Sequence, residues 1–238
     1  MAAKQARRGQ RTRTDHDSMG VLQVPADALY SASTQRAVQN FPISGISVSM
    51  EIIHAFVRLK RAAAEANNQL GKLDAKRTRL IVKVCKEIAA RLEDPATEAD
   101  MMRHFPVDIF QTGSGTSTNV NVNEVIANMI SVASSRKLGS FTPVHPNDHV
   151  NMGQSSNDTF PTAVQVAAAA RVKKSMVPDL KILASALRRK ARQFDGIVKI
   201  GRTHLQDATP IRLGQEFSGY AAQVDFAVER GHKAIHAL

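Results

Sequence analysis

The sequence has one cysteine and no long apolar run, and both absences narrow the class of protein. Cys85 stands alone among 238 residues, so an internal disulfide and a cysteine metal cluster are excluded. No apolar stretch approaches the roughly 20 residues that cross a bilayer, because charged or amide residues interrupt each one. The basic N-terminus is not followed by the apolar core of a signal peptide. We therefore expect a soluble, cytoplasmic protein with no membrane partner.

Acidic residues are scarce relative to basic ones, which gives a formal net charge of +11. About half of this excess lies before the first acid, Asp15, in a stretch with little apolar surface to anchor it. Residues 1–13 are therefore predicted to form a disordered basic arm. The charge fits two kinds of partner, nucleic acid or small anions. No recognition motif or aromatic platform accompanies it, so we favour small anions and expect no nucleic acid.

Helical periodicity dominates the rest of the chain. Apolar residues recur at spacings of three and four over residues 50–70, 78–92, 120–133, 155–176, 180–194 and 210–238. In the first of these segments the predicted buried stripe is Ile53, Phe56, Leu59, Ala63, Ala66 and Leu70. Extended pieces are short, at residues 21–24, 107–111 and 197–200, and Pro178 is expected to end the alanine-rich helix. The predicted fold class is mainly α.

The first polar cluster lies near the start of a predicted helix, between Gly113 and Asn123. Its glycines let backbone amides approach a ligand, Ser114 and Thr116 offer hydroxyl groups, and a helix N-terminus favours an anion. A dinucleotide fingerprint is not supported, because Thr118 stands in the place of its third glycine. The alternative interpretation of the cluster is a helix cap with a flexible turn.

The second polar cluster runs from residue 145 to residue 158 and is rich in amide and hydroxyl side chains. Two histidines and an aspartate within residues 145–149 suggest a metal site, but no second ligand pair with metal-like spacing follows. Residues 155–158 also suit a helix cap ahead of Pro161. Uncharged donors at a helix start fit a carboxylate better than a metal, so we expect no metal ion here.

The third polar cluster, residues 201–216, contains the candidate acid or base His204 next to Thr203. Gly201 is expected to end the preceding extended run, and Pro210 is expected to lead into the last helix. A lone histidine is more often a hydrogen-bonded structural residue than a catalyst. Together, however, three donor-rich clusters and one titratable base indicate chemistry on a small polycarboxylate.

Three segments of the chain resemble consecutive motifs of class II fumarase, in the fumarase/aspartase superfamily. They read GSGTSTNVNVNEVIAN, HPNDHVNMGQSSNDTFPTA and GRTHLQDATPIRLGQE, and with the N-terminal segment the resemblance covers about residues 12–238. Aspartases typically carry Gln where His204 stands, and argininosuccinate lyases share the THLQ element but not the HPND and SSND stretches. The resemblance implies a fumarase/aspartase-like fold, with an N-terminal domain at residues 14–153 and the start of a long-helix bundle at residues 154–238.

The resemblance also implies an activity, that of a fumarate hydratase of the tricarboxylic acid cycle, which interconverts fumarate and L-malate without a cofactor or metal. His204 would be catalytic and would handle the proton on the water side. His145, Pro146, Asn147 and Asp148 would form a second anion site, whereas His149 has no expected catalytic role. The residues implied to bind the substrate carboxylates are Ser114, Gly115, Thr116, Ser155, Ser156, Asn157 and Thr203.

Parts of the family pattern do not occur in these 238 residues. The family loop that reads GSSxMPxKxN, whose serine exchanges the carbon-bound proton, is absent, as are the remaining central helices and the C-terminal domain. Family active sites also combine segments from three subunits of a homotetramer. We therefore expect the N-terminal half of a class II fumarase, with no turnover alone. The alternatives are a non-catalytic helical subunit or relic that keeps the anion-binding motifs, and another superfamily lyase such as aspartase.

Overall fold

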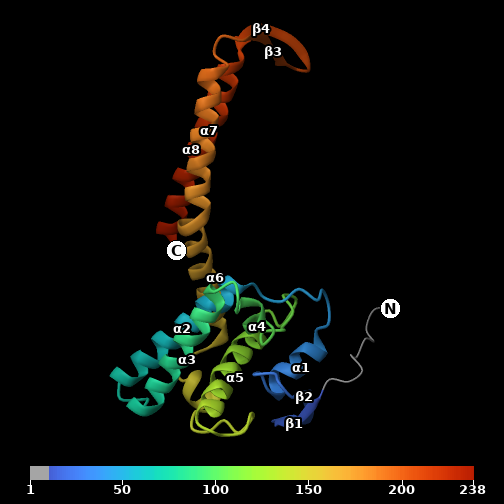
Figure 1. The fold of residues 1–238 in the computed structure, drawn as a ribbon, viewed down its shortest axis with the longest axis vertical. Helices are drawn as coiled ribbons and strands as arrows, with labels where there is room; N and C mark the ends of the chain where they lie inside the picture. The colour runs from blue at the N-terminus through green and yellow to red at the C-terminus, as the bar shows by residue number, and fades with distance from the viewer. Residues whose placement is uncertain (1–10) are drawn as a thin grey trace. The chain divides into compact units, whose positions relative to one another are not determined.

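A computed structural model describes residues 11–238, which form two compact units (Figure 1). The first unit extends to Ala167, and the second runs from Ala168 to Leu238. Helices dominate both units, and the strands form two separate two-stranded sheets. Within residues 11–238, no helix has both the length and the apolar character needed to span a bilayer.

The described chain begins with an antiparallel hairpin of β1 (Thr12–Asp17) and β2 (Gly20–Pro25). The Arg13 guanidinium donates hydrogen bonds from β1 to the carbonyl oxygens of Ala28 and Tyr30, at 2.7 and 2.5 Å. Residues 1–10 of the predicted disordered arm lie outside the described residues. The prediction nevertheless reached too far along the chain, because Thr12 and Arg13 belong to β1 and pair with β2.

Three long helices contribute most of the hydrophobic core of the first unit: α2 (Met50–Gln69), α3 (Ala75–Glu93) and α5 (Thr116–Ala133). The shorter α1 (Ala32–Asn40) packs against α5, and α4 (Glu98–Met102) packs against α3. Most residues of α5 are buried, so its amide side chains as well as its apolar ones lie inside. The large buried apolar side chains of the three long helices include Ile53, Phe56, Ile81, Ile88, Leu92, Ile126 and Ile130.

The buried face of α2 differs from the predicted stripe. Ile53 and Phe56 are buried as expected, but Leu70 lies beyond the last residue of the helix and is 71% exposed. Lys60 and Ala64 are buried instead, and they continue the stripe at helical spacing. The prediction failed at these positions because it followed apolar residues alone, whereas the buried face contains a lysine.

The second polar cluster forms a π-helical turn and the start of a helix. The turn is η1 (Pro146–Val150), which packs against α5, and the helix is α6 (Ser156–Arg171). Pro146 occupies the first position of η1, where its missing N–H costs no hydrogen bond. Both elements therefore place polar residues of the cluster at helical N-termini.

The helical backbone does not end at Pro178, contrary to the prediction. The segment η2 (Val172–Met176) is π-helical, α7 (Val177–Gln193) follows it directly, and Met176 itself has α-helical dihedral angles. Inside an α-helix a proline clashes with the carbonyl group four residues earlier and removes one hydrogen bond. A π-helical segment ahead of Pro178 changes this spacing, so the helical path continues past the proline.

The second unit contains an antiparallel pair of long helices, α7 and α8 (Leu213–Ala237) (Figure 1). A hairpin of β3 (Val198–Thr203) and β4 (Gln206–Arg212) joins them. The predicted break at Gly201 and helix start at Pro210 are therefore wrong. The register of β3 shifts at Gly201, where a side chain would press on the carbonyl oxygen of the opposite strand, so the strand bulges there and continues.

Two glycines allow α8 to approach its neighbours closely. A Cβ atom at Gly214 would lie 2.5 Å from the carbonyl oxygen of Ala191 in α7. One at Gly231 would lie 3.3 Å from the Met176 side chain. Any larger residue at position 214 would push the helix away from backbone atoms that cannot move aside.

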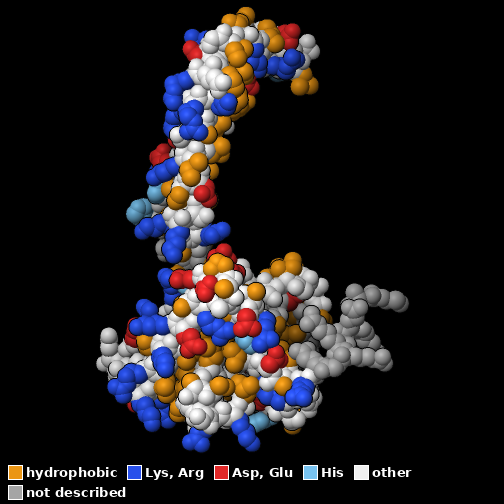
Figure 2. Space-filling view, in the orientation of Figure 1, with side chains coloured by type: hydrophobic (Ala, Val, Ile, Leu, Met, Phe, Trp, Pro, Cys, Tyr) orange, Lys and Arg blue, Asp and Glu red, His pale blue; other side chains and the backbone are white. Residues whose placement is uncertain are grey.

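The paired helices leave much apolar surface uncovered within the described chain. Figure 2 shows hydrophobic side chains, in orange, along α7 and α8. Ile182 on α7 is 68% exposed, and Phe226 on α8 is 59% exposed. By contrast, the apolar side chains that this unit buries are mostly small, namely Val177, Ala184 and Ala221.

Candidate active site

The first and second polar clusters meet at the starts of α5 and α6. Thr116 Oγ1 lies 2.7 Å from Ser114 Oγ and 2.7 Å from Ser156 Oγ, so three hydroxyl groups form one hydrogen-bonded chain. We call Ser114, Thr116 and Ser156 the hydroxyl triad. The first N–H groups of a helix have no intrahelical partners and carry partial positive charge. Hydroxyl donors beside two such helix starts suit an anion with several oxygen atoms.

Gly115 makes this arrangement possible. Its backbone is left-handed, with φ of 67°, and an added Cβ atom would overlap the ring of Phe160 in α6. Its N–H donates to the Thr112 carbonyl oxygen at 2.9 Å, and its own carbonyl oxygen accepts from Asn119 N at 3.1 Å. The turn is therefore closed by hydrogen bonds and packed against α6, rather than loosely attached.

Ser155 caps the start of α6. Its carbonyl oxygen accepts hydrogen bonds from Asp158 N at 3.1 Å and Thr159 N at 2.9 Å. Its Oγ accepts a longer bond from Asn157 N, at 3.3 Å. The side chain of Asn157 is exposed beside this cap. Ser155 thus shapes the helix start, while Asn157 presents an amide group to the solvent side.

A buried lysine that was not among the predicted site residues lies behind the hydroxyl triad. Lys60 is 0% exposed, and its Nζ donates to Asn119 Oδ1, one turn into α5, at 2.6 Å. The sequence carries a signal for it, because Lys60 stands four residues after Phe56 and four before Ala64, both on the buried face of α2. A charged side chain on a buried face needs compensating polar partners, so a lysine at this position indicates a buried polar network.

His145, directly before η1, and His149, within it, both accept hydrogen bonds from backbone N–H groups. His145 Nδ1 accepts hydrogen bonds from Asn147 N and Asp148 N, both at 3.3 Å, and lies 3.2 Å from a carboxylate oxygen of Asp148. His149 Nδ1 accepts from His145 N at 2.8 Å, and partial burial lowers the pKa of His149. The side chains of Asn147 and Asp148 are exposed. Within residues 11–238, no three His, Cys, Asp or Glu side chains cluster closely enough to hold a metal ion.

Thr203 and His204 belong to the second unit, at the tip of its hairpin. Thr203 ends β3 and pairs with Gln206, so His204 and Leu205 form the two-residue turn. Both turn residues have positive φ, 50° and 63°, as a type I′ hairpin turn requires. His204 is exposed there. The structure thus brings together the substrate-binding candidates of the first unit and presents the candidate base on a hairpin of the second.

Comparisons with known proteins agree with the sequence motifs. A family model described as "Lyase" matches residues 20–238. "Fumarate hydratase class II 2" of Bradyrhizobium diazoefficiens is 48% identical over 227 residues, which are 95% of this chain and 46% of that protein. "Fumarate hydratase class II" of Halobacterium salinarum is 51% identical over 218 residues, or 92% of this chain and 44% of that protein. The chain therefore spans just under half the length of these relatives.

A solved structure also matches closely. The fumarate lyase:delta crystallin of Brucella melitensis superposes with a TM-score of 0.86 at 39% identity, over 95% of this chain and 48% of that one. The predicted fold class, mainly α and fumarase/aspartase-like, is confirmed. Because the family model covers most of the residues, the chain belongs to the lyase family, and it is similar to the N-terminal portion of class II fumarate hydratases.

Proposed function

We propose that this chain supplies part of a fumarate hydratase site, which interconverts fumarate and L-malate. The observation that carries the proposal is the hydroxyl triad, in which Ser114, Thr116 and Ser156 converge at the starts of α5 and α6. Fumarate is a dianion at neutral pH, and each of its carboxylates accepts several hydrogen bonds. Hydroxyl and backbone N–H donors at two helix starts meet that need without a metal ion.

The residues around the triad extend the same recognition. Gly115 supplies the left-handed turn from which α5 starts, and the exposed amide of Asn157 adds a donor. Ser155 fixes the start of α6 through its backbone carbonyl oxygen. We propose that this group binds one end of the substrate. Thr203, on the β3–β4 hairpin of the second unit, stays a proposed ligand for a substrate carboxylate. His145, Pro146, Asn147 and Asp148 remain a proposal for a second anion site.

Hydration of fumarate needs a base, and we propose His204 for that role. The base takes a proton from water, the oxygen bonds to one alkene carbon, and the electron pair of the double bond moves to the other carbon. The negative charge there spreads into the adjacent carboxylate, where hydrogen-bond donors stabilise it. A proton delivered to that carbon completes L-malate. The exposed His204 imidazole can accept a proton from water in the first step.

Other assignments are weaker than fumarate hydratase. An aspartase is disfavoured by His204, since the resemblance places Gln there in aspartases. A non-catalytic helical subunit would need no titratable group at that position. We further propose a homotetramer in which other segments and subunits complete the site, and the exposed apolar side chains of α7 and α8 are consistent with such assembly. The cytoplasmic location and the place in the tricarboxylic acid cycle stay predictions.

Binding to the isotope-labelled 238-residue chain tests the proposal directly. We expect fumarate to shift the amide NMR signals of residues 114–116 and 155–157 in a saturable way. Acetate, which has one carboxylate, should shift the same signals with lower affinity, because it carries half of the negative charge of fumarate. Sodium chloride at equal ionic strength controls for general screening of the basic surface. Shifts absent from these residues, or equal with chloride, would reject the proposed site.

A further inference from the structure

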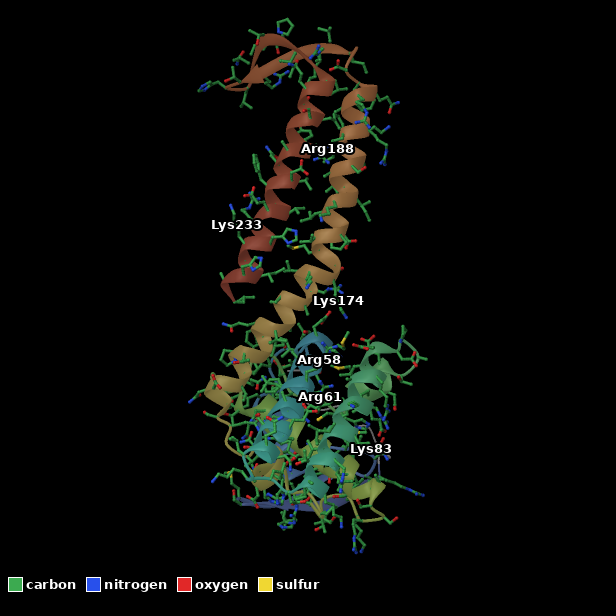
Figure 3. All side chains as sticks on the ribbon, turned by 90° about the vertical axis from the view of Figure 1, so that its left-hand side faces the viewer. Arg58, Arg61, Lys83, Lys174, Arg188 and Lys233 are labelled. Carbon is green, nitrogen blue, oxygen red and sulfur yellow. The ribbon has the colours of Figure 1, made fainter. Side chains whose placement is uncertain are left out.

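Lys60 makes three hydrogen bonds although it has no contact with solvent. Its Nζ donates to Asn119 Oδ1 at 2.6 Å, to Asn151 Oδ1 at 2.9 Å and to Gln154 Oε1 at 2.9 Å. All three partners are neutral amides, so no carboxylate among them balances the charge. Arg58 and Arg61, two and one positions away on α2, reach solvent to different degrees (Figure 3), whereas Lys60 is 0% exposed.

The geometry is that of a lysine ammonium group. An ammonium carries three N–H donors and no acceptor, which matches three amide oxygens; a neutral amine would turn a lone pair toward one of them. Burial opposes the charge and lowers the pKa of Lys60 to about 7. The three amide oxygens favour the charged form because they accept hydrogen bonds from the ammonium group. Burying a charged group costs free energy of desolvation. The segments that supply its hydrogen-bond partners are therefore the ones that Lys60 holds together.

The three partners lie just behind the starts of α5 and α6. Asn119 is one turn after the triad residue Thr116, and its backbone N–H donates a hydrogen bond to the carbonyl oxygen of Gly115. Asn151 and Gln154 lie in the segment that leads from η1 into α6. Asn119 Nδ2 also donates to Asn151 Oδ1 at 3.0 Å, and Asn151 Nδ2 donates to the Gln154 carbonyl oxygen at 3.1 Å. One ammonium group on α2 therefore ties both helix starts together.

We propose that Lys60 is a positioning residue, which holds the starts of α5 and α6 at the spacing that assembles the hydroxyl triad. The ammonium does not touch the anion; it acts through Asn119 in α5 and through Gln154, two residues before the start of α6. The role of the triad in binding rests on the proposed function, but the spacing itself does not. A shift of about 1 Å between the two starts would separate Thr116 from Ser156 and remove one end of the substrate site.

Amide hydrogen exchange without ligand tests the spacing independently of fumarate. In Lys60→Met we expect exchange at least about tenfold faster at Gly115, Asn119 and Thr159, with the amides of α3 unchanged. Arg58→Met, on the exposed side of the same helix, is the matched control and should leave all of these rates alone. Uniformly faster exchange, including α3, would assign Lys60 to general stability, and unchanged exchange would remove it from any role. Either result would overturn the proposal.

A milder variant and a rescue keep the test decisive if Lys60→Met does not fold. Gln154→Leu removes one of the three oxygens and should accelerate exchange at Thr159 more than at amides of α3. Lys60→Cys in a Cys85→Ser background, alkylated in denaturant with 2-bromoethylamine and refolded, restores an ammonium of nearly the original length. We expect it to recover wild-type exchange and fumarate affinity to within about threefold, whereas the unmodified variant should lose affinity about tenfold. Failure of the rescue would contradict the proposal, whereas wild-type chain that binds no fumarate would reject only the proposed function.

Discussion

Gly115 faces the aromatic ring of Phe160 with no room between them for a side chain. The residue also holds a left-handed backbone, with φ of 67°. Gly115→Ala should therefore lower the free energy of unfolding for two reasons. The left-handed backbone costs about 1 to 2 kcal/mol, and the overlap with Phe160 costs about 1 to 3 kcal/mol. Chemical denaturation should show a loss of about 3 kcal/mol in the free energy of unfolding.

Gly113 provides the matched control for this prediction. It lies two residues away in the same loop, and an added Cβ atom there would meet nothing within 4 Å. Gly113→Ala should change the free energy of unfolding by less than about 1 kcal/mol. Equal losses for the two variants would mean that the packing against Phe160 is not what requires glycine at position 115.

The centre of the hydroxyl triad should matter most for anion binding. Thr116→Val keeps the shape of the side chain but removes the hydroxyl that bridges Ser114 and Ser156. A hydrogen bond to a charged ligand contributes about 1.5 to 3 kcal/mol, so fumarate affinity should fall at least about tenfold. Calorimetric or NMR titration measures it. Thr112→Val, an exposed neighbour, should bind as the wild type does; if the two variants lose affinity equally, the triad is not the binding group.

His204 should be essential for turnover and unimportant for folding. In a fusion of residues 1–238 to the C-terminal portion of a class II fumarate hydratase, His204→Asn should lower kcat about 100- to 10,000-fold. Asparagine tolerates the positive φ of 50° at this turn, so the hairpin should survive. The rate is followed by the ultraviolet absorbance of fumarate, with the exposed His232→Asn on α8 as control. An unaffected rate would remove His204 from its role.

Acid should weaken the start of α3 through Asp74. The Arg77 N–H and guanidinium donate to this carboxylate and lower its pKa to about 2, from an ordinary value of 3.8. The unfolded chain then binds the proton first, so this contribution to stability is complete above about pH 4 and is lost as the pH falls toward 2. Asp74→Asn can still cap the helix but cannot titrate. Urea unfolding between pH 2 and 5 should show a shallower pH dependence for Asp74→Asn, and parallel curves would contradict the assignment.

Periodicity predicted the long helices well because most of their buried residues are apolar. The helices at residues 50–70, 78–92 and 180–194 were placed within a few residues of α2, α3 and α7. The same rule failed at Lys60, since a lone charged residue in a stripe looks like an interruption unless its three amide partners are known. Those partners come from segments 59 to 94 residues away, and no local pattern indicates them.

Local signals also misled where tertiary context decides the backbone. Pro178 was expected to end a helix, but the π-helical turn before it accommodates the ring. The β3–β4 hairpin was not predicted, because glycine and proline usually interrupt a strand, whereas here Pro210 pairs with Ile200 beside the bulge at Gly201. The motifs did predict which residues carry the candidate site. They could not predict that Thr116 and Ser156, 40 residues apart, share a hydrogen bond.

Gly214 and Gly231 fix more than the distance between α8 and its neighbours. Both glycines lie in α8, near its two ends, and 17 residues of helix (231 minus 214) rise about 25 Å. These two close contacts lie at separate points along α8. A sliding or tilting motion of α8 relative to its neighbours would therefore break at least one of them. The β3–β4 hairpin is attached directly to this braced pair. His204 therefore lies on a hairpin whose two flanking helices are in close contact at two separate points.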